Sequence, residues 1–281
     1  MAINKHKTSS ILYHYTSVET LLKIIENSND DKICFRATHA KFFNDPFEYK
    51  LAFSLLKTSL TKYENQISSG KKLRPKFQNK SLSSLGQLFG NPHILSLSEN
   101  SDDLTMWRTY GFDGSGVSIG LDKKMLEEYS NDKNLKNTKL IKCVYDRNKI
   151  LKGLINYWKY VYPTININEE NRLVFSSFSF ALNLTDFCFS FKRSEYQSEK
   201  EWRLCKNDGE DKNIKFYERN GLLIPYIEHY FPKEIIKKII VGPCVNKELT
   251  KESIEIFLKI KGFSLTEDFI GKSKMPYRNF K

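Results

Sequence analysis

Two carboxylates and a guanidinium lie close together in the segment SEKEWRLC, at Glu199, Glu201 and Arg203. If this segment is a strand, the three charged groups point one way while Trp202 and Leu204 point into the core. Paired carboxylates can act in acid–base chemistry or stabilise a cationic transition state. The same pattern also fits a solvated strand face on which an Arg203 ion pair contributes little stability.

A histidine interrupts the apolar segment ILYHYT near the start of the chain. Alternation along a strand places Tyr13 and Tyr15 on one face, and His14 and Thr16 on the other. In that position His14 is a packed core residue, a metal ligand or a hydrogen-bonding partner for a sugar hydroxyl. The segment alone leaves these three interpretations open.

The segment SLSENSDDLTMWRTYG predicts the end of a strand followed by a short helix. Ser96 and Ser98 share a strand face, and Trp107 and Tyr110, three residues apart, share a helix face. An aromatic pair at this spacing is either part of a core or a platform on which a ring stacks.

Periodicity predicts the elements that must position these residues. Thr16, Ser17 and Glu19 supply a T-x-x-E capping-box pattern before a helix whose apolar residues recur at helical spacing. Strands are expected at 13–15, 32–37, 93–99, 116–121, 140–146, 201–206, 221–226 and 236–242, further helices at 100–111, 148–161, 169–187 and 246–262, and a turn at 42–49. Because strands and helices mix without a regular βαβ rhythm, the predicted fold class is α+β.

The chain length predicts one domain. A chain of 281 residues can bury a sizeable core, and we expect a single domain over 1–281 with an ordered part over 10–280. Residues 66–92 are polar, basic and weakly patterned, and we expect them to form a mobile surface insertion.

Composition argues against a membrane or secreted protein. Hydrophobic residues make up 40% of the chain, and no apolar run approaches the roughly 18 residues of a membrane span. The segment MAINKHKTSS lacks the apolar core of a secretion signal, and the five cysteines lie singly, without a CxxC pair. We expect a soluble, cytoplasmic protein without disulfides.

The formal charge of +12 indicates a basic surface. Such a surface attracts phosphates on nucleic acid, nucleotides or anionic lipid. The abundance of lysine over arginine equally fits a bias in genome base composition. Nucleic-acid contact therefore stays one of two interpretations of the charge.

Several common motifs are absent from the sequence: GxGxxG, GxxxxGK[ST], HExxH and GxSxG. The five histidines are scattered without paired ligand spacing, so no metal site is expected. The three segments described first remain as the candidates for chemistry.

The blocks LYHYTS, FNDPFE, SLSE, MWRTYG, GVSIGL, EKEWR and KSKMPYR follow one another in an order that resembles a widespread bacterial family of unknown function, number twenty-nine seventy-one. That family is itself similar, more loosely, to ADP-ribosyltransferase-like domains. The similarity implies an α+β fold with a split, mostly antiparallel sheet and flanking helices. It also implies NAD as the substrate.

ADP-ribosyltransferase-like sites combine a first-strand His or Arg, a middle-strand Ser or Tyr, and a late-strand Glu. By this resemblance Glu201 would stabilise the oxocarbenium-like state in which the nicotinamide–ribose bond breaks. Tyr110 would stack on nicotinamide, and Arg203 would bind the pyrophosphate or orient the carboxylates. The implied site residues are Glu201 and Glu199 as catalytic carboxylates, and His14, Tyr15, Thr16, Ser96, Ser98, Tyr110 and Arg203 as NAD-binding residues.

The expected function is therefore that of an NAD-dependent ADP-ribosyltransferase-like enzyme, of the kind used as toxins or phage-defence effectors. Its acceptor would be a protein or a nucleic acid. Two alternatives stay open: an NAD glycohydrolase with the same site, and a non-catalytic nucleic-acid-binding or regulatory protein.

Overall fold

The described part of the chain carries all three candidate segments. In the computed structural model, the described residues are 10–26, 32–43, 47–68, 92–135, 137–164, 166–167, 173–174, 186–187, 189–207, 213–243 and 246–277.

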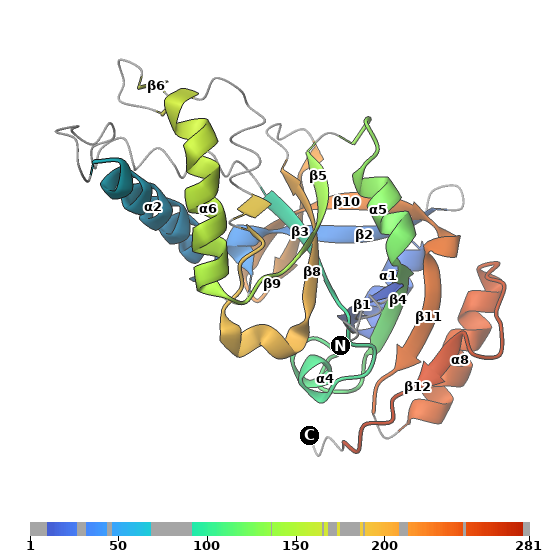
Figure 1. Ribbon diagram of the computed structural model, residues 1–281. Coiled ribbons are helices and arrows are strands. Elements are labelled where there is room, and N and C mark those ends of the chain that lie inside the picture. Colours follow the sequence, from blue (N-terminus) through green and yellow to red (C-terminus); the bar gives the residue numbers. More distant parts are fainter. Residues whose placement is uncertain are drawn as a thin grey trace, which may run out of the picture.

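A large, mostly antiparallel sheet forms the centre of the molecule (Figure 1). Its strands are β1 (Ile11–Thr16), β2 (Lys32–His39), β3 (Pro92–Ser98), β4 (Val117–Asp122), β5 (Thr138–Lys142), β8 (Glu201–Asn207), β9 (Lys215–Arg219), β10 (Leu222–Pro232), β11 (Ile236–Val241) and β12 (Ile270–Lys272). Only β11 and β12 pair in parallel among these strands. A separate pair consists of β6 (Asn166–Ile167) and β7 (Leu173–Val174). The predicted mixture of helices with a mostly antiparallel sheet is confirmed.

Helices cover both faces of this sheet. They are α1 (Val18–Glu26), α2 (Phe47–Ser68), α4 (Leu104–Thr109), α5 (Lys123–Ser130), α6 (Arg147–Val161) and α8 (Lys247–Ile260). Short 3-10 turns occupy Ala40–Phe42, Tyr162–Thr164, Ser194–Glu199 and Lys233–Ile235. The first helix is capped by Ser17, whose Oγ accepts a hydrogen bond from the Thr20 amide at 3.0 Å.

Strand β3 is the branching point of the sheet. It pairs with β8 along its whole length, from Pro92↔Asn207 to Ser98↔Glu201. Both β1 and β2 also pair with β3, β1 at Ser98 and β2 at His93 and Ile94. Because β8 already occupies one edge of β3, β1 and β2 must share the other edge at its opposite ends.

Three clusters of buried apolar side chains fix the two faces. The main core lies under α1, α5 and α8, and it includes Phe35, Leu95 and Leu204. On the other face, a second cluster packs under α2 and α6, and a third packs Trp107 of α4 against β1. We call the face that carries the main core the main-core face, and the face that carries the second and third clusters the α6 face.

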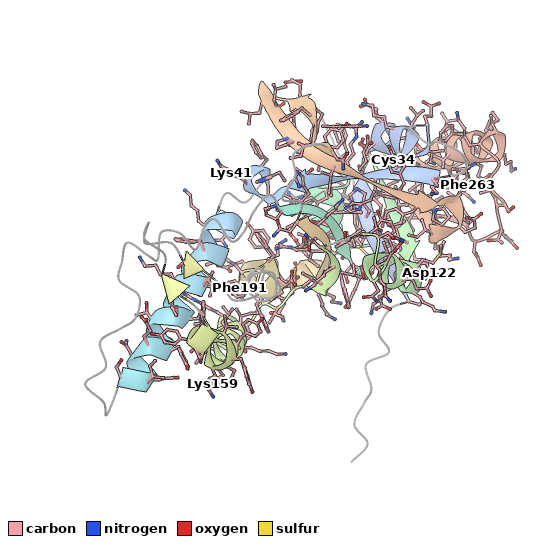
Figure 2. All side chains as sticks on the ribbon, turned by 90° about the horizontal axis from the view of Figure 1, so that it is seen from above. Cys34, Lys41, Asp122, Lys159, Phe191 and Phe263 are labelled. Carbon is pink, nitrogen blue, oxygen red and sulfur yellow. The ribbon has the colours of Figure 1, made fainter. Side chains whose placement is uncertain are left out.

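The second cluster joins α2 and α6 to the sheet. These two helices lie side by side at one end of the molecule (Figure 1). Figure 2 places Phe191 in this region, with Lys159 of α6 nearby, and Phe263 at the opposite end of the molecule. Trp158 of α6 is fully buried, and its Nε1 donates to Ser59 Oγ of α2 at 2.9 Å.

Some predicted elements are wrong or fall outside the described residues. The helix predicted at 169–187 is contradicted at Leu173–Val174, which form a strand. Asp186 and Phe187 at its end are helical, and its other residues are not described. Helix α2 was not predicted, and it includes 66–68 of the proposed insertion, while 69–91 lie outside the described residues. The turn at 42–49 ends in this helix at Phe47, and its residues 44–46 are likewise not described. Among the described helices, none is long and apolar enough to cross a membrane.

Candidate functional site

Strand β8 displays the charged residues on the α6 face. Glu201 pairs with Ser98 and Arg203 with Ser96, while Leu204 faces the main core and is fully buried. The predicted alternation in this strand is confirmed. The prediction that Trp202 is buried in the core is wrong. Trp202 is half-buried at the rim of the main core, and its Nε1 donates to Glu99 Oε1 at 2.9 Å.

Glu199 does not belong to the strand. It ends the 3-10 turn Ser194–Glu199, and the following Lys200 adopts a left-handed conformation with φ 44° and ψ 49°. The prediction that Glu199 continues strand β8 is therefore wrong. The chain reversal at Lys200 nevertheless brings the carboxylates of Glu199 and Glu201 to one shared cation.

That cation is Lys192. Its Nζ forms an ion pair with Glu199 Oε2 and a second with Glu201 Oε2 at 2.9 Å. Arg203 Nη2 contacts the same Glu201 oxygen at 2.9 Å, and Arg203 Nη1 donates to the Phe189 carbonyl at 2.9 Å. We call Lys192, Glu199, Glu201 and Arg203 the charge cluster.

The charge cluster is closed to solvent. Each of its four side chains is at most 6% exposed, so they are not the solvated strand face considered from the sequence. Two acids and two bases balance one another formally. Buried charges are tolerated when they are paired and hydrogen-bonded. Removal of one partner leaves the remaining charges uncompensated, which lowers the stability of the fold.

Glu201 is held firmly as an anion. Burial alone would raise the pKa of its carboxyl group, but Arg203 and Lys192 outweigh burial and bring the pKa to about 2. The Glu201 amide donates to the Tyr145 hydroxyl at 2.8 Å, and the Cys143 thiol contacts Glu201 Oε2 at 3.5 Å. Burial raises the pKa of Cys143 well above its usual value, so this thiol stays protonated.

Tyr110 connects the cluster with the surface. Its hydroxyl donates to Glu199 Oε1 at 3.1 Å, and the residue is half-buried at the end of α4. Burial raises the pKa of Tyr110 far above its usual value, and the Glu199 charge raises it further. The neutral phenol is therefore a hydrogen-bond donor to Glu199 over the physiological pH range.

The two serines have different surroundings. Ser98 is fully buried, its Oγ donates to the Glu199 carbonyl at 2.6 Å, and it accepts from the Asn100 amide at 3.0 Å. Ser98 thus fixes the backbone of Glu199. Ser96 is exposed, although it lies opposite Arg203.

His14 lies on the main-core face. Tyr13 pairs with Ser98 and so shares the face of the charge cluster, whereas His14, the next residue, points the opposite way. The His14 ring contacts Phe35 edge-on at 5.7 Å, and its Nδ1 lies 3.1 Å from the Ser96 carbonyl oxygen. Burial lowers the pKa of His14, with the Ser96 contact opposing that effect. The structure therefore does not bring His14 to the two carboxylates.

Tyr15 supports the turn that leads into α4. Its hydroxyl donates to the Asn100 carbonyl at 3.0 Å and accepts from the Asp103 amide at 3.2 Å. Its ring packs edge-on against Trp107 at 4.8 Å. Thr16 is buried at the end of β1, opposite Val117.

Asp102 anchors the same turn. Its Oδ1 accepts from Trp107 Nε1 and from Ser273 Oγ, each at 2.6 Å, and its Oδ2 accepts from the Lys274 amide at 2.7 Å. The segment after β12 is thereby tied to α4. Because α4 carries Tyr110, these bonds help to position the hydroxyl that meets Glu199.

Three residues of the site were not singled out from the sequence: Lys192, Cys143 and Tyr145. No fixed spacing relates them to the carboxylates. The one usable signal was electrostatic, because two buried carboxylates on one face require a nearby cation besides Arg203. Among the described residues, no group of three or more His, Cys, Asp or Glu side chains could hold a metal ion.

No curated protein and no solved structure matches the chain. The matched region is residues 106–204, which include Tyr110, Cys143, Lys192 and both carboxylates of the charge cluster. Over those residues the chain matches the model of the family described as "Protein of unknown function (DUF2971)".

Proposed function

We propose that the protein is an NAD-dependent ADP-ribosyltransferase-like enzyme whose site is formed by Tyr110, Ser98 and the charge cluster. One observation carries the proposal. Two carboxylates, Glu199 and Glu201, share the Nζ of Lys192, and one of them also accepts a hydrogen bond from a half-buried tyrosine. The pKa values of Glu201 and Tyr110 are shifted from their usual values, and ionisable groups with shifted pKa values held at one point are typical of catalytic sites.

The reaction needs a carboxylate to stabilise its transition state, in which the ribose carries positive charge. The bond between the nicotinamide nitrogen and ribose C1′ breaks, its electron pair leaves with the nitrogen, and positive charge develops on the ribose. An acceptor then attacks C1′ and releases a proton. A carboxylate hydrogen-bonded to the ribose 2-hydroxyl stabilises this transition state more than the ground state.

Glu199 fits this role better than Glu201. The Glu201 oxygen Oε2 contacts Lys192, Arg203 and the Cys143 thiol at once. Glu199 Oε1 instead meets the hydroxyl of Tyr110, which reaches the surface. A substrate that displaces this hydroxyl can form its own hydrogen bond with Glu199, while Glu201 keeps Lys192 in place.

The other residues take supporting roles. Ser98 fixes the Glu199 carbonyl, and Tyr110, once displaced, can stack on the nicotinamide ring. We leave His14 out of the proposed site because it points to the opposite face of the sheet. Arg203 orients Glu201 rather than the substrate, since the guanidinium is 2% exposed.

The test is NAD consumption by wild type, Glu199→Gln and Glu195→Gln. Glu195 lies in the same 3-10 turn but is exposed, so its variant removes an equal charge without touching the cluster. We expect loss of about 10²-fold or more in Glu199→Gln and no change in Glu195→Gln. Equal consumption by all three proteins contradicts the role of Glu199, provided that thermal melting shows each variant folded.

Radiolabelled NAD incubated with cell lysate separates the rival functions. Label on a macromolecule supports a transferase, and free ADP-ribose supports an NAD glycohydrolase at the same site. The net charge of +12 favours the second candidate, a nucleic-acid-binding protein. That candidate predicts no NAD consumption, together with nucleic-acid binding that weakens steeply with salt.

A further inference from the structure

Helix α8 carries large apolar side chains on two sides. Ile254 and Leu258 are buried in the main core. Leu249, Ile256 and Ile260 are instead 66%, 61% and 76% exposed, and none of them joins a core cluster of the described residues. A surface helix ordinarily turns polar side chains to water on the side away from its core. Helix α8 therefore presents a second apolar side to solvent.

The exposed apolar residues form one stripe along the helix. Leu249, Ser253, Ile256 and Ile260 follow one another at spacings of four, three and four, and all four are exposed. This alternation is that of the a and d positions at which two helices meet in a coiled coil. Ser253 Oγ donates to the Thr250 carbonyl of its own helix at 2.9 Å, so this hydroxyl needs no further partner if the stripe is covered. We call these four residues the α8 stripe.

The α8 stripe lies at the outer edge of the molecule. Helix α8 packs against β11 and β12, the last two strands at one end of the sheet. Figure 1 shows α8 at that margin, far from α2 and α6. Because the buried side of α8 meets the strands, the stripe faces away from them. A contiguous apolar patch open to solvent is typical of an interaction surface.

Two opposite charges lie on one flank of the α8 stripe. Glu252 and Lys259 each precede a stripe residue by one position, and both are exposed. They are seven residues apart, about 10 Å along the helix axis, so they are too distant to pair with each other. The ion pairs that α8 forms within the described part of the chain involve Lys251, Glu255 and Glu248. Glu252 and Lys259 are thus available to charges on a partner.

A second copy of α8 complements the stripe when the two helices run antiparallel. A two-fold axis between Ser253 and Ile256 sets Leu249 of each copy against Ile260 of the other. It sets Ser253 against Ile256 in the same way. The small serine lets the helices approach each other, and the three large apolar side chains of each copy leave water.

The flanking charges favour the antiparallel arrangement over the parallel one. When the helices run antiparallel, the same flank of each copy meets, so Glu252 faces Lys259 of the second copy, and the two-fold axis repeats this pair. When they run parallel, each charged flank meets the opposite flank of the other helix, where Thr250 and Phe257 carry no charge. Charge complementarity therefore selects both the occupant and its direction.

We propose that the α8 stripe is the contact of a homodimer in which two α8 helices pack antiparallel about a two-fold axis. Closed two-fold dimers are the commonest form of protein self-association. An interface made by one pair of helices is small, so the dimer is weak and depends on protein concentration. Helix α8 lies on the main-core face, whereas the charge cluster lies on the α6 face, so the dimer does not depend on the proposed reaction with NAD.

Analytical ultracentrifugation of the full chain over a range of concentrations measures the dimer. Ile256→Gln keeps a good helix former but removes an apolar side chain that each copy buries, so it should raise the dissociation constant about tenfold or more. Leu223→Gln is the matched control, because Leu223 of β10 is 67% exposed and lies outside the stripe. We expect the wild-type dissociation constant in this control, with thermal melting to show that both variants are folded.

Exchange of the flanking charges tests the direction of the helices. Glu252→Lys sets lysine against Lys259 of the second copy at both symmetric positions, and Lys259→Glu sets glutamate against glutamate. Each single variant should weaken the dimer, and the double variant should recover the wild-type dissociation constant. Glu195→Lys, an equal change of charge at an exposed residue outside α8, should leave the dimer unchanged.

Three results would overturn the proposal. The first is a chain that stays monomeric at every concentration. The second is equal dimerisation of wild type and Ile256→Gln, and the third is a double charge variant that remains as weak as the single ones. A monomer that instead binds anionic lipid vesicles, and loses this binding in Ile256→Gln, would also overturn it and make a membrane surface the occupant of the stripe.

Discussion

The hydroxyl of Tyr110 donates a hydrogen bond to Glu199 Oε1 at 3.1 Å, across 89 residues of sequence. This contact joins helix α4 to the charge cluster, and it is the place where the cluster approaches the surface. If Glu199 acts on NAD, the phenol must first move from the carboxylate. Tyr110 then both shields the carboxylate and contributes a ring to the substrate.

Tyr110→Phe should separate these two roles. The variant keeps the ring and removes a hydrogen bond to a charged group, so the free energy of unfolding should fall by about 1.5–3 kcal/mol. The KM for NAD should fall or stay the same, because no bond to Glu199 has to be broken. Tyr110→Ala should raise the KM for NAD, since the stacking ring is lost. Steady-state kinetics of both variants measure these changes. A higher KM in Tyr110→Phe than in wild type would contradict the displacement of the hydroxyl.

Lys192→Met should be strongly destabilising. It leaves Glu199 and Glu201 buried with Arg203 as the remaining cation of the cluster, and removal of one partner from a buried ion pair typically costs about 3–5 kcal/mol. Urea unfolding measures this difference. The double variant Lys192→Met with Glu199→Gln should recover part of the loss, because it removes one of the two unbalanced carboxylates.

Acid should destabilise the protein in two stages. His229 has a folded pKa of about 3 against 6.5 in its ordinary state, so the unfolded chain binds more protons as pH falls below about 6.5. Glu201 has a folded pKa of about 2 against 4.5, so its contribution is present above about pH 4.5 and is lost toward pH 2. His14, whose pKa is also lowered, adds to the first stage.

The first stage can be isolated with His229→Gln. Calorimetric melting at pH 7.5 and 5.5, in buffers free of phosphate and carboxylate, should show a smaller loss of Tm in the variant than in wild type. The two proteins should lose stability in parallel, through Glu201, only below about pH 3, where His229 of folded wild type is itself protonated. An identical loss between pH 7.5 and 5.5 in both would show that His229 is not held neutral by burial.

The burial of two residues of β8 predicts which of two alanine substitutions lowers stability more. Leu204 is fully buried in the main core, whereas Trp202 is half-buried at its rim. Leu204→Ala should cost about 2–5 kcal/mol, and Trp202→Ala should fall below the roughly 3–5 kcal/mol of a buried tryptophan. Chemical denaturation of both variants gives the ranking, and a larger cost for Trp202→Ala would contradict it.

Periodicity in the sequence located most of the strands and the alternation in β8, because one face of that strand meets the apolar core. It did not locate Lys192, since a contact between Lys192 and the carboxylates depends on how the chain returns to β8 after α6. It misplaced Glu199 because the left-handed Lys200 leaves no mark in the residue pattern. Helix α2 was missed because Pro46 and its neighbours predicted a turn, and the following residues are only weakly amphipathic.

The resemblance to ADP-ribosyltransferase-like domains placed His14, Ser98 and Glu201 in one site. The register of β1, β3 and β8 brings Ser98 and Glu201 together and sends His14 to the other face. Single-sequence reasoning assigns faces only relative to neighbours within one strand. The relation between two strands depends on which residues pair, and the sequence does not state that pairing.

Asp102→Asn should loosen the segment that follows β12 and, through α4, the position of Tyr110. The Asp102 carboxylate accepts hydrogen bonds from Trp107, Ser273 and the Lys274 amide, and an amide side chain has only one oxygen to replace two. Hydrogen exchange should therefore become faster at the Lys274 amide and at the amides of α4, while β4 and β11 keep their protection. Asp113→Asn is the matched control, because Asp113 accepts from Tyr277 of the same segment but lies beyond α4. If α4 exchanges equally fast in wild type and Asp102→Asn, then Asp102 does not position the helix that carries Tyr110, and the hydrogen bond to Glu199 is set by β1 and Trp107 alone.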